Sequence, residues 1–204
     1  MKPCGRPKKG SAGGDSRQKM IDTAVALIAE NGADALTVRS VCEKADLSIA
    51  TFYHFFENKD NLLMHFVRDV SFDSLELTVP FTDVAGRCAE LYMHLIDRYR
   101  ALGLAFMKSF YTTGNRALSA YMGAGGGAFP KGTVMARCEN ELNEAKRLGV
   151  INADADTHQI SADVCTIVKG CVFEWCLCDG EMEIEKAISR IIQHYFAAGI
   201  VRDS

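Results

Sequence analysis

Apolar residues recur three or four positions apart along almost the whole chain, and this spacing limits the possible folds more than any other feature. Near the N-terminus, for example, Ile21, Val25 and Ile28 form one such stripe. A stripe of this kind lies on one face of an α-helix. No segment combines period-two alternation with turn residues, which is the pattern of a half-buried β-strand. The sequence therefore predicts an all-α fold.

The composition is that of a globular protein, with 48% hydrophobic and 24% charged residues among 204. The longest uncharged stretch, 117–130, has 14 residues and contains four glycines. A membrane helix needs about 18 to 20 apolar residues, so no membrane partner is expected. The basic N-terminus is not followed by the apolar run of a secretory signal. The expected location is therefore the cytoplasm.

Charge is distributed unevenly along the chain. Residues 1–20 carry six basic residues against one acidic residue, a net charge of +5, although the whole chain has a net charge of −3. The other 184 residues carry 17 basic and 25 acidic residues, a net charge of −8. A basic arm on an acidic body indicates that one end of the protein meets a polyanion.

Helix signals predict a three-helix unit within residues 15–60. Asp15 is a candidate cap for the first helix, and Asn31-Gly32 is a typical helix end. Thr37 and Ser48 are good N-caps for a second and a third short helix. The three-residue turn 45–47 separates these two helices, which is the spacing of a helix-turn-helix unit.

Beyond this unit, helical spacing continues to the end of the chain. A fourth helix is expected from Lys59 as far as Leu77. The later helices are expected at residues 84–99, 102–111, 134–145, 156–178 and 183–198, with a glycine-rich loop at 114–130. The expected organisation is a flexible basic arm (1–14), a helix-turn-helix domain (15–60) and a C-terminal helical domain (61–204).

Residues 37–62 resemble the DNA-binding unit of the TetR (tetracycline-repressor) family. The matching positions are Thr37, Ala45, Leu47, Ser48, Thr51, Phe52, Tyr53, Phe55, Phe56 and Lys59. Residues 147–156, Gly170 and Trp175 also follow a pattern of that family's ligand-binding half. Two positions depart from the family pattern: Asp46 replaces the usual turn glycine, and Phe55 replaces a common tyrosine or histidine.

The resemblance implies a transcriptional regulator, most often a repressor, that a small-molecule ligand releases from its operator. It also implies a homodimer on a palindromic double-stranded DNA site. In such a dimer, helices at 156–178 and 183–198 pair across a two-fold axis. No glycine-rich phosphate loop, nucleophile elbow or paired metal motif stands in the sequence, so no enzymatic activity and no cofactor are expected.

The residue types in the helix-turn-helix unit suit DNA contacts. Arg39 is the best candidate for a guanine, because its fork matches O6 and N7. Tyr53, Lys59 and Thr37 suit phosphate oxygens. The expected DNA-binding residues of the unit are Thr37, Arg39, Ser48, Ile49, Ala50, Thr51, Tyr53, His54 and Lys59. The alternative is that Arg39, Tyr53 and His54 are ordinary exposed side chains.

The N-terminal arm offers a second DNA contact. Gly5-Arg6-Pro7-Lys8-Lys9 is similar to the core of an AT-hook, although Cys4 replaces the usual preceding arginine. The negative potential of a narrow A·T minor groove attracts arginine. Arg6, Lys8 and Lys9 are therefore expected to bind DNA, either in the minor groove or along the phosphates.

The resemblance implies a small-molecule pocket in the C-terminal domain. The residues that could line it are Met93, His94, Phe106, Met107, Phe110, Tyr111, Cys171 and Trp175. Aromatic and methionine side chains at helical spacing are also ordinary core residues.

Cysteine is frequent, with eight residues in the chain. No secretory signal is expected and the chain is long enough for a normal core, so reduced thiols are expected. Cys171, Cys176 and Cys178 lie close in sequence, but their spacing matches no common zinc pattern. Helical geometry would place Cys171 and Cys178 on one face. Buried cysteines that act as small apolar residues are one interpretation, and a thiol- or metal-responsive regulator is the alternative; no metal ligands are expected.

Overall fold

The computed structural model describes residues 12–32, 35–68, 71–112, 114–122 and 127–198. Within them the chain is mainly α-helical and contains no β-strand, which confirms the all-α prediction. In chain order the helices are α1 (Ala12–Asn31), α2 (Val38–Ala45), α3 (Ile49–Phe55), α4 (Lys59–Arg68), the 3-10 helix η2 (Phe81–Asp83), α5 (Val84–Leu102), α6 (Leu104–Phe110), α7 (Arg116–Met122), α8 (Val134–Arg147), α9 (Thr157–Leu177) and α10 (Ile184–Ala197). None of these helices is long and apolar enough to cross a membrane.

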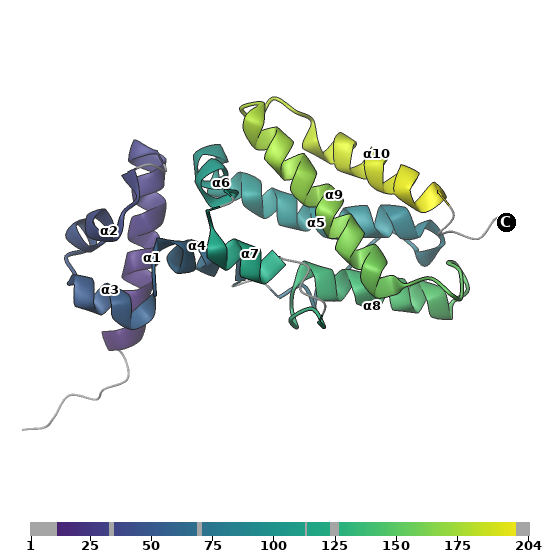
Figure 1. The fold of residues 1–204 in the computed structure, drawn as a ribbon, viewed down its shortest axis with the longest axis horizontal. Helices are drawn as coiled ribbons and strands as arrows, with labels where there is room; N and C mark the ends of the chain where they lie inside the picture. Colours follow the sequence, from purple (N-terminus) through teal and green to yellow (C-terminus); the bar gives the residue numbers. More distant parts are fainter. Residues whose placement is uncertain (1–11, 33–34, 69–70, 113, 123–126, 199–204) are drawn as a thin grey trace, which may run out of the picture.

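Helices α1, α2 and α3 form a small bundle at one end of the elongated molecule (Figure 1). Their apolar stripes meet in its centre. The buried side chains there include Ile21, Ala24, Ile28, Val41, Cys42 and Phe52. The helix-turn-helix unit expected from the cap residues is therefore present, and α4 leads from it to the second half of the molecule.

The second half is built around α5, which packs against α8 and α10 (Figure 1). Helix α9 packs against the same two helices and also contacts α6. The core side chains include Leu91, Leu95, Val164, Val168, Ile188 and Ile192. The apolar stripes of these long helices are thus their buried faces.

Between α4 and α5, residues 71–80 form an extended linker rather than a helix. Arg137 of α8 donates hydrogen bonds to linker carbonyl oxygens at 3.2, 2.5 and 3.0 Å; they belong to Phe72, Asp73 and Leu75. A charged donor fixed to a helix thereby satisfies backbone groups that a helix would otherwise have satisfied internally.

A buried carboxylate holds Arg137 in place. Glu141 accepts hydrogen bonds from the Nε atoms of Arg87 and Arg137, each at 2.6 Å, and its side chain is 8% exposed. Arg87 also donates to the linker carbonyl of Val79 at 2.5 Å. Glu90 of α5 accepts from the backbone N–H groups of Thr78 and Val79. The linker is therefore fastened to both α5 and α8.

Three predicted boundaries were wrong. Helix α1 begins at Ala12, so residues 12–14 are helical rather than part of the arm, and Asp15 lies in the first helical turn, where a carboxylate is favourable. Helix α4 ends at Arg68 instead of continuing to Leu77. The backbone of the linker bonds instead to side chains of α5 and α8, such as Glu90 and Arg137. Helix α7 lies inside the predicted loop 114–130, because the buried Asn115 side chain accepts a hydrogen bond from the Leu118 N–H and starts a helix.

Candidate nucleic-acid interface and effector region

Helix α3 is held in place by the buried side chain of its anchor, Phe52, and is capped at its N-terminus by Ser48. Phe52 is fully buried, whereas Ile49 and Tyr53 are 51% and 57% exposed. Ser48 is the N-cap, and its Oγ accepts a hydrogen bond from the Thr51 N–H at 3.0 Å. Ala50 and His54 are also exposed. The anchor fixes the inner face of α3, and the residues that the sequence assigned to DNA lie on the outer face.

The hydroxyl groups of Ser48 and Thr51 also bond to each other, with their oxygen atoms 2.8 Å apart. Both side chains lie at the surface, Ser48 exposed and Thr51 half-buried. They can still accept or donate one further hydrogen bond each, since a hydroxyl carries one donor and two acceptor positions.

Helix α2 starts with a reciprocal pair of hydrogen bonds. Thr37 is the N-cap, its Oγ1 accepts from the Ser40 N–H at 3.0 Å, and its own N–H donates to Ser40 Oγ at 2.9 Å. The sequence identified the cap but missed its partner, because serine replaces the glutamate that this motif usually carries. The Thr37 N–H and the Thr37 hydroxyl both donate to Ser40 Oγ, at 2.9 and 3.1 Å, so the exposed hydroxyl must turn away from Ser40 to donate to a phosphate.

Arg39 is the second residue of α2, and its side chain is 82% exposed. Its Nε donates to Glu43 Oε1 at 2.7 Å, and the Glu43 carboxylate raises the pKa of the Arg39 guanidinium. Both terminal nitrogen atoms of the guanidinium stay outside this ion pair. The spacing i, i+4 of Arg39 and Glu43 was a readable signal for the pair that the sequence interpretation did not use.

The turn between α2 and α3 depends on Asp46. This residue adopts φ 52° and ψ 50°, the left-handed conformation that favours glycine. Its N–H bonds to the Glu43 carbonyl oxygen at 3.3 Å, and the Leu47 N–H bonds to that of Cys42 at 3.0 Å. Asp46 thus has a positive φ at the position where the family pattern has glycine.

Lys59 is exposed at the first position of α4, as expected for a phosphate ligand near a helix N-terminus. The sequence missed the residue that caps this helix: Asn58 Oδ1 accepts from the Asn61 N–H at 2.9 Å. It also missed Arg17 of α1, whose guanidinium lies 5.6 Å from the centre of the Phe56 ring. Arg6, Lys8 and Lys9 lie outside the described residues.

The predicted effector residues occupy the second half at different depths. Phe106, Met107 and Phe110 are at most 1% exposed, and Cys171 and Trp175 are also buried. Met93, His94 and Tyr111 are half-buried. Phe106 and Phe110 stack with ring centres 5.6 Å apart, whereas Met93 and His94 lie on α5. These side chains form part of a packed core, and Trp175 borders a small apolar gap of about 150 Å³.

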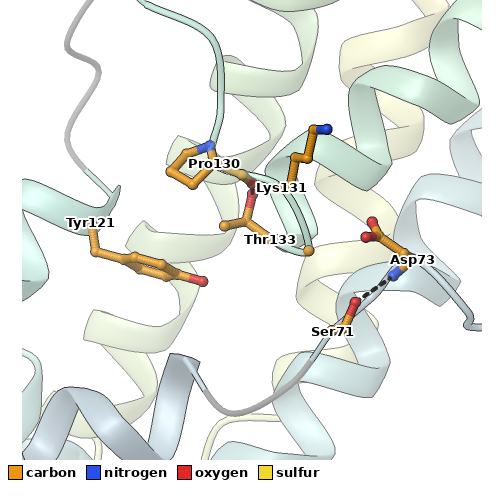
Figure 2. A pocket seen from close by; sticks show the side chains of 7 residues that line it. Ser71, Asp73, Tyr121, Pro130, Lys131 and Thr133 are labelled. Atoms are coloured by element: carbon orange, nitrogen blue, oxygen red, sulfur yellow. Dashed lines mark hydrogen bonds between the residues drawn. The ribbon is translucent and has the colours of Figure 1, made fainter.

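A wider pocket, about 440 Å³, opens at the surface between the linker and the start of α8 (Figure 2). Ser71 and Asp73 of the linker lie on one side and Tyr121 of α7 on the other (Figure 2). The segment 130–133 supplies the rest of the wall. The Phe72 N–H bonds to the Gly132 carbonyl oxygen at 2.9 Å, so this wall is attached to the linker.

The thiol groups are mostly buried. Cys42, Cys88, Cys138, Cys165, Cys171 and Cys176 are buried, and Cys178 is exposed at the end of α9. Cys178 is the C-cap residue, beyond the last residue of α9, so its exposed environment differs from that of the buried Cys171. Burial raises the pKa of the Cys165, Cys171 and Cys176 thiols, which lowers their reactivity. This favours cysteines that act as small apolar residues.

Residues 20–65 match the family model described as "Bacterial regulatory proteins, tetR family". Over 50 residues the chain is 34% identical to the HTH-type transcriptional repressor KstR of Rhodococcus jostii (strain RHA1) and 32% identical to that of Mycolicibacterium smegmatis. Each match covers 24% of this chain and 24% of the relative. The sequence similarity thus spans about a quarter of these curated relatives and is limited to one region.

The fold is shared over a longer span. The structure of a SmeT–triclosan complex aligns with a TM-score of 0.60 at 22% identity and covers 93% of both chains. A TetR transcriptional regulator from Agrobacterium tumefaciens aligns with a TM-score of 0.59 at 17% identity, covering 90% of this chain and 94% of the other. The chain therefore has a helix-turn-helix domain similar to that of the tetR family of bacterial regulatory proteins, on a fold that it shares with solved TetR regulators over most of its length.

Proposed function

We propose that the protein is a transcriptional repressor that binds double-stranded DNA as a homodimer and leaves its operator when a small molecule binds. The observation that carries this proposal is the outer face of α3, where Ile49, Ala50, Tyr53 and His54 are exposed around the buried anchor Phe52. A helix of this kind fits the major groove, where base edges are read. The KstR relatives are named as repressors. Such a regulator works in the cytoplasm, and we expect no enzymatic turnover.

The proposed DNA contacts divide into two kinds. Arg39 is proposed to bind a guanine, and the exposed side chains of α3 are proposed to meet neighbouring base edges. Thr37, Ser48, Thr51, Tyr53 and Lys59 are proposed to bind phosphate oxygens or to hold the helix N-termini toward them. Arg6, Lys8 and Lys9 are proposed to add counterion release along the backbone.

The homodimer is proposed to form through α9 and α10. Phe173 and Leu177 of α9 are 50% and 62% exposed, although both are large apolar side chains. Ile191 and Tyr195 of α10 are half-buried. Two copies paired through these side chains could place two helix-turn-helix units about 34 Å apart, in successive major grooves. Static light scattering that finds a monomer at micromolar concentration would refute this part of the proposal.

The effector is proposed to act through the linker. The linker joins α4, which leaves the DNA-binding bundle, to α5 and α8 of the second half. A ligand that moves α5 or α8 would therefore move α4 and change the distance between the two recognition helices. Coupling of about 1–3 kcal/mol is enough for such a switch. The SmeT structure is that of a complex with triclosan, so a protein of the same fold binds a small molecule.

The central experiment tests the helix-turn-helix contacts. The preferred DNA site is first selected from a random pool, and fluorescence anisotropy then measures the affinity for this site and for random duplexes. Arg39→Ala should weaken the preferred site about 10-fold to 100-fold and relax base choice at one position per half-site. Tyr53→Phe should weaken all sequences about equally, because phosphate contacts carry no sequence information.

Lys186→Ala provides the matched control, because Lys186 is an exposed cation on α10. It should bind both kinds of DNA like the wild type. If Arg39→Ala and Tyr53→Phe also bind like the wild type, the assignment of residues 37–55 to DNA is wrong.

The arm is tested separately by deleting residues 1–11. The deletion removes Lys2, Arg6, Lys8 and Lys9 from each subunit. The slope of log K against log salt should become shallower by up to about four units per dimer if two groups per subunit contact phosphate. Specific and random DNA should weaken alike, except that A·T-rich flanks lose more if Arg6 enters the minor groove. An unchanged slope would show that the arm does not contact DNA.

A further inference from the structure

One carboxylate lies on the face of the protein that is proposed to meet DNA. Glu43 is on α2, one helical turn after Arg39, and its side chain is 64% exposed. A negative side chain near DNA phosphates weakens binding, because it offsets the cations that displace counterions. The presence of Glu43 at this place therefore calls for an explanation.

Glu43 and Arg39 share a surface hollow with the start of α3. The hollow has a volume of about 570 Å³, and the residues that line it include Arg39, Glu43, Asp46, Ser48 and Ile49. Ser48 and Ile49 stand at the N-terminal end of the helix that is proposed to enter the major groove. The ion pair thus lies beside that end of α3, and not on a remote face of the bundle.

The ion pair fixes which donors of Arg39 remain available. A guanidinium has five N–H donors, and it can bind a planar acceptor through Nε with one terminal nitrogen or through both terminal nitrogens. Glu43 Oε1 accepts from Nε at 2.7 Å, so the first of these two forks is occupied. The second fork, which also matches O6 and N7 of a guanine, stays outside this bond.

The charge of Glu43 favours one of the two acceptors that this fork can bind. Helix α2 is the first helix of the helix-turn-helix unit, which crosses the DNA backbone, so Arg39 can reach a phosphate as well as a base. A phosphate oxygen is negative and is repelled by Glu43 and by Asp46, which lines the same hollow. The O6 and N7 atoms belong to an uncharged base, so the carboxylates oppose them far less. Repulsion of a wrong partner is a common source of specificity.

The ion pair contributes little to the stability of the free protein. Both side chains are exposed, and such a pair on a helix is screened by solvent. DNA in the hollow would exclude part of this solvent, and the attraction between Arg39 and Glu43 would then be stronger. Changes at Glu43 should therefore alter DNA recognition without altering the fold.

We propose that Glu43 is a positioning residue that directs Arg39 to a guanine and away from the phosphates. It holds Nε, so that the terminal nitrogen atoms point one way, and its charge makes a phosphate contact unfavourable. This inference rests on the proposed function, because it concerns the same DNA-binding site. It assigns the specificity of Arg39 to a residue that itself contacts no base.

The test combines site selection with a double-mutant cycle in the full-length protein. The wild type, Arg39→Ala, Glu43→Ala and the double variant each select DNA from a random pool, and anisotropy then measures affinity for the wild-type site and for random duplexes. Glu43→Ala should weaken the wild-type site about 3-fold to 10-fold and strengthen random DNA about two-fold. It should relax base choice at the same position as Arg39→Ala. The double variant should select DNA like Arg39→Ala alone, because both residues act through one contact.

Two further variants separate the hydrogen bond from the charge. Glu43→Gln keeps an acceptor for Nε but loses the charge, so it should keep the base preference and still bind random DNA more tightly. Glu57→Gln is the matched control, because Glu57 is an exposed carboxylate between α3 and α4 whose partner is Asn61, at 3.0 Å. It should leave base choice unchanged. All these variants should melt within about 3 °C of the wild type, since exposed pairs contribute little to stability.

The proposal fails if Glu43→Ala leaves base choice unchanged, or if it relaxes a different position from Arg39→Ala, which would mean that Glu43 reads a base itself. Additive losses in the double variant would also overturn it. So would a Glu43→Gln variant that relaxes base choice like Glu43→Ala, or a Glu57→Gln control that does the same. None of these results affects the proposed function as long as the wild type selects a defined site. If the wild type selects no DNA sequence, the proposed function fails and the role of Glu43 fails with it.

Discussion

The helix-turn-helix bundle (α1–α3) and the second half of the molecule both contain local helix caps, but their long-range ion pairs differ in burial: Lys44–Glu30 is exposed, whereas Arg87–Glu141 is largely buried. In the bundle, the caps of α2 and α3 join residues three positions apart, as between Thr37 and Ser40. In the second half, Arg87 binds Glu141, 54 residues away along the chain. Local contacts depend on residue type and spacing, whereas long-range contacts depend on how whole helices pack.

The polar side chains of the two regions also differ in solvent exposure and in their hydrogen-bond partners. In the bundle, the polar side chains on the outer faces of α2 and α3 remain in solvent, ready for another molecule. In the second half, Glu141 is buried between two guanidinium groups, whereas the buried hydroxyl groups of Tyr92 and Tyr99 have only the Cys165 thiol and the Tyr111 hydroxyl beside them. The comparison teaches that the proposed DNA-binding surface stands out by its exposure, whereas the polar groups of the second half can be judged only by counting their hydrogen-bond partners.

The largest effect should come from breaking the long-range pair in the second half. Glu141→Ala removes the acceptor for two largely buried guanidinium groups, Arg87 and Arg137, and should lower the free energy of unfolding by about 3–5 kcal/mol. Glu139→Ala, on the same helix, removes a partly exposed partner of His158 and should cost about 1 kcal/mol or less. Urea unfolding followed by circular dichroism measures both. Equal losses would show that the linker is not fastened by Glu141.

A smaller effect is expected from breaking a local contact in the bundle. Thr37→Ala removes the cap of α2 and should cost about 1 kcal/mol, confined to the bundle. Thr37→Ser keeps the hydroxyl and should behave like the wild type. Hydrogen exchange of the α2 amides should rise only in the alanine variant. Faster exchange in α8 or α9 as well would mean that the two regions are less independent than their contacts indicate.

The smallest effect should come from the turn. Asp46→Ala keeps the left-handed conformation but loses the side chain that tolerates it, and should cost about 1 kcal/mol. Asp46→Gly removes that conformational penalty and should be at least as stable as the wild type within about 0.5 kcal/mol. It should also bind DNA slightly more tightly, because a negative charge near the phosphates is lost. Thermal melts and anisotropy test this, and an alanine variant as stable as the glycine variant would contradict it.

Much of the bundle could be predicted from the sequence, including Thr37 and Ser48 as caps and the exposed outer face of α3. These features depend on short-range rules, in which a side chain three residues away satisfies a backbone N–H group. The start of α1 was missed because glycines in residues 12–14 disfavour a helix. The role of Ser40 was missed because the usual capping partner is glutamate or glutamine.

In the second half, the sequence by itself determined that long helices would form and which faces they would bury, because apolar spacing fixes both. Only the tertiary structure decided that residues 71–80 would leave the helix, since their carbonyl groups bond to Arg137 from a helix 60 residues later. It also decided that the hydroxyl groups of Tyr92 and Tyr99 would be buried beside the Cys165 thiol and the Tyr111 hydroxyl. The hydrogen-bond partner of a buried polar atom often comes from a residue far away in the sequence, so residue spacing cannot predict it.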